Sequence, residues 1–128
     1  MKRTALLLRA FILAALAVPA SAGQTVPGTP LVIHVVAERF IFTPDQITVE
    51  QGTLVEIRLT SEDTDHGFRL IGPGDIDIEI PKRGRGDVRV TFEADEPGEY
   101  TFECSRVCGA GHGFMRGTLR VRRGDSSH

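Results

Sequence analysis

From Leu31 onward the sequence predicts an all-β domain, with its strands arranged as a Greek-key sandwich or barrel. Short segments in which every second residue is apolar are separated by glycine, proline and aspartate, which is the pattern of such folds. The stretch from Asp95 to Tyr100 is a predicted turn into a strand, and its tyrosine resembles the tyrosine corner of Greek-key sandwiches. We find no convincing helical periodicity, so we expect a domain built of strands.

The first predicted strand, residues 31–37, is apolar on both faces, so we expect other parts of the protein to cover both of them. His34 lies within this strand. We interpret it as a strand residue whose ring is satisfied by a neighbour or by solvent, and not as a metal ligand.

The strands that follow combine an apolar face with a polar one, as expected when one face covers a core and the other meets solvent. Their apolar positions are, in order, Phe40 and Phe42, Ile47 and Val49, Val55, Ile57 and Leu59, Phe68 and Leu70, Ile76, Ile78 and Ile80, Val88, Val90 and Phe92, Tyr100 and Phe102, and Leu119 and Val121. The basic run Lys82, Arg83 and Arg85 falls between two of these strands, and we interpret it as a solvated turn. Docking of a partner at that turn is the alternative.

Residues 1–22 have the organisation of a cleavable signal peptide. Two basic residues precede an apolar run from Ala5 to Val18 that only Arg9 interrupts, and Ala20-Ser21-Ala22 forms a small-x-small cleavage site. An uncleaved membrane anchor is the alternative, but a spanning helix needs about 20 apolar residues and the run after Arg9 has about half that number. We therefore expect export to a bacterial periplasm, with no stable insertion in the membrane after cleavage.

Cleavage after Ala22 would leave a mature chain with three predicted parts. We expect a linker at 23–30, a single domain at 31–123 and a disordered tail at 124–128. The whole chain has 15 basic and 17 acidic residues, and the signal peptide carries three of the basic ones, so the mature charge is 12 minus 17, or −5. This charge excludes a nucleic-acid binder as the default class and favours encounters with basic partners.

Residues 104–115 hold both cysteines of the chain, one of its four histidines and one of its two methionines. These residues are Cys104, Cys108, His112 and Met115. Their spacing would also place them on one face of a helix, but the glycines at 109, 111 and 113 argue against it, because each costs a helix interior about 1 kcal/mol relative to alanine. A loop is therefore predicted, in which glycine lets the backbone turn the four donor groups toward one point.

The donor groups of this loop favour copper. Thiolate and thioether sulfurs are soft ligands and imidazole is intermediate, a mixture that suits copper better than magnesium, calcium or manganese. Zinc is the alternative metal, but methionine is a poor zinc ligand, and the loop supplies only three cysteine or histidine groups where structural zinc sites have four. The missing imidazole must come from elsewhere. His66 is the candidate, because it shares the inward-facing parity of Phe68 and Leu70 at the edge of the predicted core.

A disulfide between Cys104 and Cys108 is the main structural alternative, because an exported chain meets an oxidising compartment. Such a bridge would close a loop of about five residues, and short loops gain little stability from closure. The neighbouring His112 and Met115 favour a metal site instead. A mononuclear copper site would need only one of the two cysteines and would leave the other unexplained.

The pattern Cys104-x-x-x-Cys108-x-x-x-His112-x-x-Met115, with Asp65-His66-Gly67-Phe68 upstream, resembles the binuclear copper A domain of cytochrome c oxidase subunit II and nitrous oxide reductase. The resemblance covers most of the mature chain, from Phe40 to Val121, and implies a cupredoxin-type fold. In that family two cysteine thiolates bridge two copper ions.

The resemblance also implies a role for each residue of the site. Cys104 and Cys108 would be the bridging thiolates. His66 and Met115 would complete one copper, and His112 with the backbone carbonyl of Arg106 would complete the other. The family commonly has glutamate where this chain has Arg106, so we expect the added cation to alter the reduction potential or the choice of partner.

By this resemblance the mature protein is a periplasmic electron carrier, or the electron-entry component of an oxidase, that exchanges electrons with a redox protein such as a c-type cytochrome or a terminal oxidase. The chain lacks the paired transmembrane helices of oxidase subunit II, so we expect it to be soluble after export. It contains no tryptophan, the residue that oxidase subunits use near the cytochrome docking surface.

We expect no enzyme activity from the domain by itself, since the site offers no open coordination position. A copper-binding protein that delivers the metal for oxidase assembly is the alternative function, and a zinc-stabilised or disulfide-closed interaction module is a further one.

Overall fold

The structure is a computed structural model that describes residues 28–124. The predicted signal peptide, residues 23–27 of the predicted linker and residues 125–128 of the predicted tail lie outside the described residues. The described residues form nine strands and a single turn of 3₁₀ helix. Among them there is no helix of the length and apolar character needed to cross a membrane.

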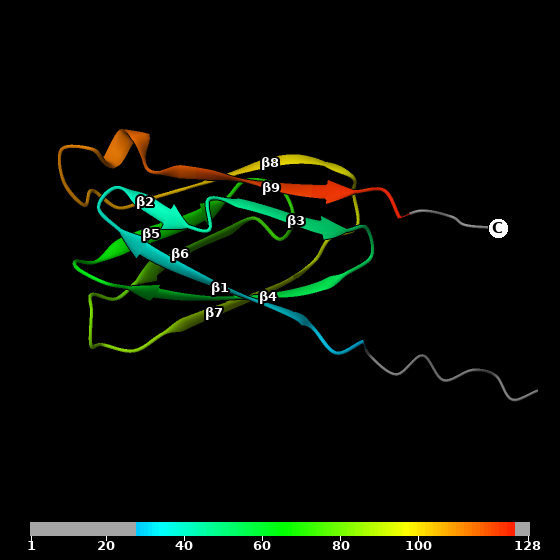
Figure 1. Cartoon of the computed structure of the whole chain (residues 1–128), viewed down its shortest axis with the longest axis horizontal. Coiled ribbons are helices and arrows are strands. Elements are labelled where there is room, and N and C mark those ends of the chain that lie inside the picture. Colours follow the sequence, from blue (N-terminus) through cyan, green and yellow to red (C-terminus); the bar gives the residue numbers. More distant parts are fainter. Residues whose placement is uncertain (1–27, 125–128) are drawn as a thin grey trace, which may run out of the picture.

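The strands form two sheets that stack as a sandwich (Figure 1). The first sheet has the order β2-β1-β4-β7, formed by β2 (Ile41–Thr43), β1 (Leu31–Glu38), β4 (Leu54–Ser61) and β7 (Val88–Glu93). The second has the order β3-β9-β8-β5-β6, formed by β3 (Gln46–Glu50), β9 (Arg116–Arg122), β8 (Gly98–Glu103), β5 (His66–Leu70) and β6 (Ile76–Ile80). Both sheets are mixed, because β1 runs parallel to β4 and β3 runs parallel to β9. The predicted all-β architecture is therefore confirmed as a sandwich.

The space between the sheets is filled by the apolar positions that the period-two alternation predicted to face inward. On β4, for example, Val55, Ile57 and Leu59 are all buried. Phe42 of β2 packs against two rings of the opposite sheet, Phe68 at 5.8 Å and Phe102 at 5.4 Å between centroids. Edge-to-face pairs of this kind add to the burial of apolar area, so this ring cluster ties the two sheets together.

The first strand departs from the prediction that both of its faces are covered. Leu31 and Val32 keep 46% and 37% of their surface exposed, and only Val35 and Ala37 are buried. At its start β1 pairs with β4 alone, since β2 pairs with β1 only from Val36 to Glu38. His34 is exposed, consistent with its interpretation as a strand residue.

Two predicted turns are confirmed. Tyr100 donates a hydrogen bond from its hydroxyl to the carbonyl of Glu96 at 2.9 Å, which is the contact expected of a tyrosine corner. The basic turn between β6 and β7 is exposed at Lys82, Arg83 and Arg85, and the side chain of Arg83 lies 3.7 Å from the carboxylate of Glu62.

The pairing of β5, β8 and β9 brings the predicted metal-binding residues to one end of the sandwich. Strands β8 and β9 are antiparallel neighbours, and the loop between them, 104–115, carries the 3₁₀ turn η1 (His112–Phe114). Strand β5 runs antiparallel to β8, so its first residue, His66, lies beside the end of β8. Figure 1 shows η1 and this loop at the end of the molecule opposite the one at which β9 finishes.

Candidate metal centre

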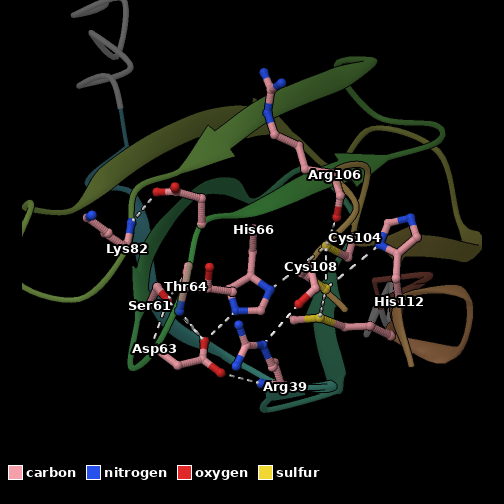
Figure 2. Close-up of polar contacts among 12 residues, drawn as sticks. Arg39, Ser61, Asp63, Thr64, His66, Lys82, Cys104, Arg106, Cys108 and His112 are labelled. Atoms are coloured by element: carbon pink, nitrogen blue, oxygen red, sulfur yellow. Dashed lines mark hydrogen bonds and ion pairs between the residues drawn. The ribbon is translucent and has the colours of Figure 1, made fainter. Parts of the chain in front are cut away.

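Two cysteine sulfurs form the middle of a cluster of donor atoms. The Sγ atoms of Cys104 and Cys108 lie 3.6 Å apart, and both thiols are free. The Nδ1 atom of His66 is 3.9 Å from the Cys104 sulfur. Nδ1 of His112 and Sδ of Met115 each lie 3.8 Å from the Cys108 sulfur. The structure thus brings together all five side chains that the sequence singled out, and Figure 2 shows both imidazoles directed at the sulfurs.

Most of these donors are shielded from water. His66 has no exposed surface, and Met115 keeps 1% of its surface exposed. Cys104 and Cys108 are buried, whereas His112 is half-buried. One atom of each of His66, Cys104 and Cys108 lies within 4.8 Å of the others, which is close enough for all three to hold one metal ion.

The position of His66 follows from its strand. The alternation of β5 turns His66, Phe68 and Leu70 toward the core, and all three are buried. Gly67, between them, approaches the ligand loop so closely that its N–H donates to the Cys104 sulfur at 3.4 Å. A Cβ atom at this glycine would overlap Ser105 Oγ and would lie 2.8 Å from the backbone nitrogen of Arg106.

The backbone of the ligand loop is closed at its base and packed at its middle. The N–H of Cys104 donates to the carbonyl of Met115 at 3.0 Å, which joins the two ends of the loop. Gly109 has φ of 144°, a conformation that a residue with a Cβ rarely adopts, and it lies against the ring of Phe40. Two of the three glycines that argued against a helix, Gly109 and Gly111, therefore permit the close packing against Phe40.

The backbone carbonyl and the side chain of Arg106 point in different directions. Its carbonyl oxygen is 3.0 Å from the Cys104 sulfur, while its side chain extends away from the cluster (Figure 2). The guanidinium is exposed and forms an ion pair with Glu79, with Nε 3.2 Å from Oε2. The cation that the sequence placed beside the site is therefore at the surface and paired with a carboxylate.

Burial changes the acid–base behaviour of the site. It raises the pKa of the Cys108 thiol to about 11, with a further contribution from the hydrogen bond to the Cys104 sulfur. A metal ion binds the thiolate, so loading the site must release the proton that this thiol holds at neutral pH.

Asp63 has the opposite shift. Burial acts to raise its pKa, but hydrogen bonds from the His66 ring and from the backbone N–H groups of Arg39 and Thr64 outweigh burial and lower the pKa to about 2. The carboxyl group is therefore ionised at neutral pH, and it provides a negative charge next to a buried histidine.

Sequence patterns did not identify two residues that contact the ligands. Asp63 accepts a hydrogen bond from Nε2 of His66 at 2.6 Å, and Arg39 donates from Nε to the carbonyl of Cys108 at 2.9 Å. An acidic residue three positions before the candidate histidine was a usable signal for Asp63. Nothing in the spacing indicates Arg39, which is 69 residues from Cys108.

The donor set fits a soft transition metal. It consists of two thiol sulfurs, one thioether sulfur and two imidazole nitrogens, a combination that suits copper. Carboxylates, which magnesium, calcium and manganese prefer, do not contact the sulfurs among the described residues. The residues therefore fit the copper ions that the sequence implied.

Comparisons with known proteins agree with this architecture. The Cupredoxin-like domain family matches residues 5–121. A cytochrome c oxidase subunit 2 from Thermus thermophilus is 38% identical over 90 residues, which is 70% of this chain and 64% of that protein. A nitrous-oxide reductase from Stutzerimonas stutzeri is 34% identical over 84 residues, which is 62% of this chain and 13% of the reductase. The chain thus spans less than two thirds of the length of these relatives.

Solved structures share the fold at lower identity. The periplasmic domain of subunit II of cytochrome oxidase from Bradyrhizobium japonicum superposes with a TM-score of 0.63 at 19% identity. The superposition covers 77% of this chain and 88% of that domain. At this identity the likeness concerns the arrangement of strands.

Proposed function

This chain belongs to the cupredoxin-like domain family, and from that membership we propose that it is a periplasmic electron-transfer protein with a binuclear copper centre of the copper A type. The observation that carries the proposal is the pair of buried cysteine sulfurs, 3.6 Å apart, at the centre of the donor cluster. A mononuclear copper site of the cupredoxin type would need only one of these sulfurs. Two sulfurs in the middle, with further donors on both sides, suit a pair of ions that share them.

We assign the ligands as the sequence resemblance implies. Cys104 and Cys108 would hold both copper ions, His66 and Met115 would complete one, and His112 with the carbonyl of Arg106 would complete the other. When bound, the two copper ions would supply a one-electron couple whose charge is spread over both metals.

The protein contributes rigidity and exclusion of water. Cys104 and Met115 are held opposite each other by the backbone hydrogen bond that closes the loop, and His66 is held by the pairing of β5 with β8. Ligands fixed in this way move little when the charge of the site changes, which favours fast electron transfer. Four of the five ligand side chains are buried, so water has little access to the sulfurs.

Arg106 is compatible with this role. The proposed ligand is its backbone oxygen, which already faces the Cys104 sulfur. The side chain forms an exposed ion pair with Glu79, and solvent and the nearby carboxylate both weaken its field at the site. We therefore expect a smaller effect of this cation on the reduction potential than the sequence alone suggested.

The relatives suggest the setting in which such a protein works. Because one of them is a subunit of cytochrome c oxidase, we propose that this domain exchanges electrons with a c-type cytochrome or a terminal oxidase. We propose no catalytic activity for the domain itself.

The test is copper loading of the purified protein that starts at residue 23. We expect two copper ions per chain and a paramagnetic resonance spectrum with hyperfine structure from one electron shared by two equivalent copper nuclei. A single-copper spectrum would replace the proposal with a mononuclear site. Weak binding of Cu(I) that passes readily to a chelator would favour the copper-delivery alternative.

The Cys108→Ser variant tests the bridging role of the second sulfur. Serine removes the soft donor, so we expect the shared-electron spectrum to disappear and the bound copper to fall to one ion or none. Ser105→Ala is the matched control, because Ser105 lies on the same loop and donates to Asp77 at 2.6 Å instead of contacting the sulfurs. Retention of the shared-electron spectrum in Cys108→Ser would show that this sulfur is no bridge.

A further inference from the structure

A chain of hydrogen bonds connects His66 with the backbone of Cys108 through two residues outside the proposed ligand set. Nε2 of His66 contacts Oδ1 of Asp63 at 2.6 Å. The other carboxylate oxygen, Oδ2, accepts the backbone N–H of Arg39 at 3.0 Å. The side chain of Arg39 then donates from Nε to the carbonyl of Cys108 at 2.9 Å. Figure 2 shows Asp63 and Arg39 lying together on the side of His66 away from Arg106.

At one end of this series of hydrogen bonds, Asp63 determines which ring nitrogen of His66 carries a proton. A carboxylate can only accept, so Nε2 of His66 must carry the proton that makes the hydrogen bond. With the proton on Nε2, the lone pair of a neutral ring lies on Nδ1, the atom 3.9 Å from the Cys104 sulfur. Asp63 is itself held by the backbone N–H of Thr64 at 2.7 Å, so the carboxylate cannot turn freely.

The Arg39 end joins segments that are distant in the sequence. Arg39 lies in the turn between β1 and β2, 24 residues before Asp63 and 69 before Cys108. Its main chain holds the loop that leads to β5, and its side chain holds the loop between β8 and β9. A backbone hydrogen bond from Glu62 to Ala37 at 3.0 Å ties the same turn region to the same loop.

We propose that Asp63 and Arg39 form a brace that sets the geometry of the site before metal enters and tunes its reduction potential with two opposite charges. Both are positioning residues, since each acts through a ligand. Outer groups that orient a metal-bound histidine raise its basicity and restrict its motion. The significance of the brace rests on the proposed copper centre, but its existence can be tested in the metal-free protein.

The first experiment measures the ring tautomer of His66 by nitrogen NMR in the metal-free protein. We expect a single tautomer, protonated on Nε2, in the wild type. Asp63→Ala removes the acceptor and should give a mixture of tautomers. Asp63→Asn can still accept through its amide oxygen and should keep the wild-type tautomer, which separates the position of the acceptor from its charge.

The matched control for Asp63 is Asp65→Asn. Asp65 belongs to the same loop, and its carboxylate accepts the backbone N–H of Lys82 at 2.7 Å, whereas Nε2 of His66 pairs with Asp63. A single Nε2-protonated tautomer in Asp63→Ala would overturn the brace, as would an equal change in Asp65→Asn. This measurement needs no copper, so a protein that failed to bind two copper ions would refute the proposed function and leave this test intact.

The second experiment uses the copper-loaded protein and compares charge removal at the two ends. Loss of the carboxylate in Asp63→Asn should raise the reduction potential, because a negative charge stabilises the more positive, oxidised site. Arg39→Met keeps the aliphatic stem, the backbone N–H and its bond to Asp63, but removes the cation, so it should lower the potential. Shifts of opposite sign are not expected from a general loss of stability.

The copper affinity gives an independent measure of how far Asp63 and Arg39 support the site. We expect the dissociation constant for copper to rise by about 10-fold or more in Asp63→Ala, and by less in Arg39→Met, which retains the His66 contact. The control for Arg39 is Arg116→Met, because Arg116 donates to the carbonyl of Gly113 on the same loop at 2.7 Å. Shifts of the same sign in Asp63→Asn and Arg39→Met, or an unchanged affinity in Asp63→Ala, would refute the tuning role.

Discussion

At the scale of single residues, the site depends on four residues whose side chains are not proposed metal ligands. Gly67 brings its backbone N–H to the Cys104 sulfur because it has no side chain. Arg106 offers a carbonyl to the same sulfur and keeps its charge at the surface. Asp63 and Arg39 contribute hydrogen bonds to atoms of ligands without touching the sulfurs themselves.

Substitution of Gly67 by alanine tests this close approach. The added Cβ would overlap Ser105 Oγ and lie 2.8 Å from the backbone of Arg106, so the ligand loop must shift. We expect a loss of about 1–3 kcal/mol in the free energy of unfolding, as for other overpacked sites. We also expect a changed copper spectrum, and both are measured on the purified variant by denaturant titration and spectroscopy.

Gly113→Ala is the control for this variant. It lies on the same loop, and an added Cβ there would meet no atom within 4 Å. Equal effects of the two substitutions would contradict the close packing of Gly67 against the loop.

At the scale of elements, β8 is the strand on which the site depends. Its pairing with β9 runs from Gly98 opposite Val121 to Glu103 opposite Arg116, and Cys104 is the residue that follows the end of β8. Its pairing with β5 supplies His66. The tyrosine corner anchors β8 at the start of the strand, at the end of the sandwich away from the metal site.

The Tyr100→Phe variant tests this anchor. It keeps the ring that packs over Gly72 and removes only the hydroxyl that donates to Glu96. We expect a loss of about 1 kcal/mol in the free energy of unfolding, the usual net value of one hydrogen bond. The denaturation midpoint should fall while the slope of the transition stays constant. Because the anchor lies far from the cluster, a change in the copper spectrum of this variant would contradict our account of the element.

At the scale of the whole molecule, stability depends on contacts between the two sheets. Phe42 is the ring of the first sheet that meets Phe68 and Phe102 of the second, and the latter two stack at 5.3 Å. Phe68 is two residues from His66, and Phe102 is two residues from Cys104. The inter-sheet core therefore supports both parts of the metal site.

Phe42→Ala is expected to cost about 3–5 kcal/mol of unfolding free energy, because it removes a buried ring and leaves a cavity. That is a large part of the roughly 5–15 kcal/mol by which a domain is stable, so the melting temperature should fall strongly. Ile41→Ala is the matched control, since Ile41 is the neighbouring residue on β2 and is 55% exposed. Its cost should stay within about 0.5 kcal/mol, and a comparable loss in both variants would contradict a central role for Phe42.

Local patterns were enough to predict most strands and the ligand loop. Alternation along a strand depends only on neighbouring residues, so the inward faces of β3, β4 and β5 could be assigned directly. The loop was predictable because its donors lie within a dozen residues and its glycines exclude a helix. The exposure of Leu31 and Val32 could not be predicted, because alternation along one strand does not show how much of each face the rest of the fold covers.

The sequence by itself determined the β architecture, the family and the set of candidate donor side chains. Each of these depends on residue types and on their spacing over short stretches of sequence. Only the tertiary structure decided how the donors face one another and which residues hold them. The hydrogen bonds from Arg39 to Asp63 and to Cys108 span 24 and 69 residues. Such long-range contacts form only after the strands have paired into sheets, so no local sequence pattern predicts them.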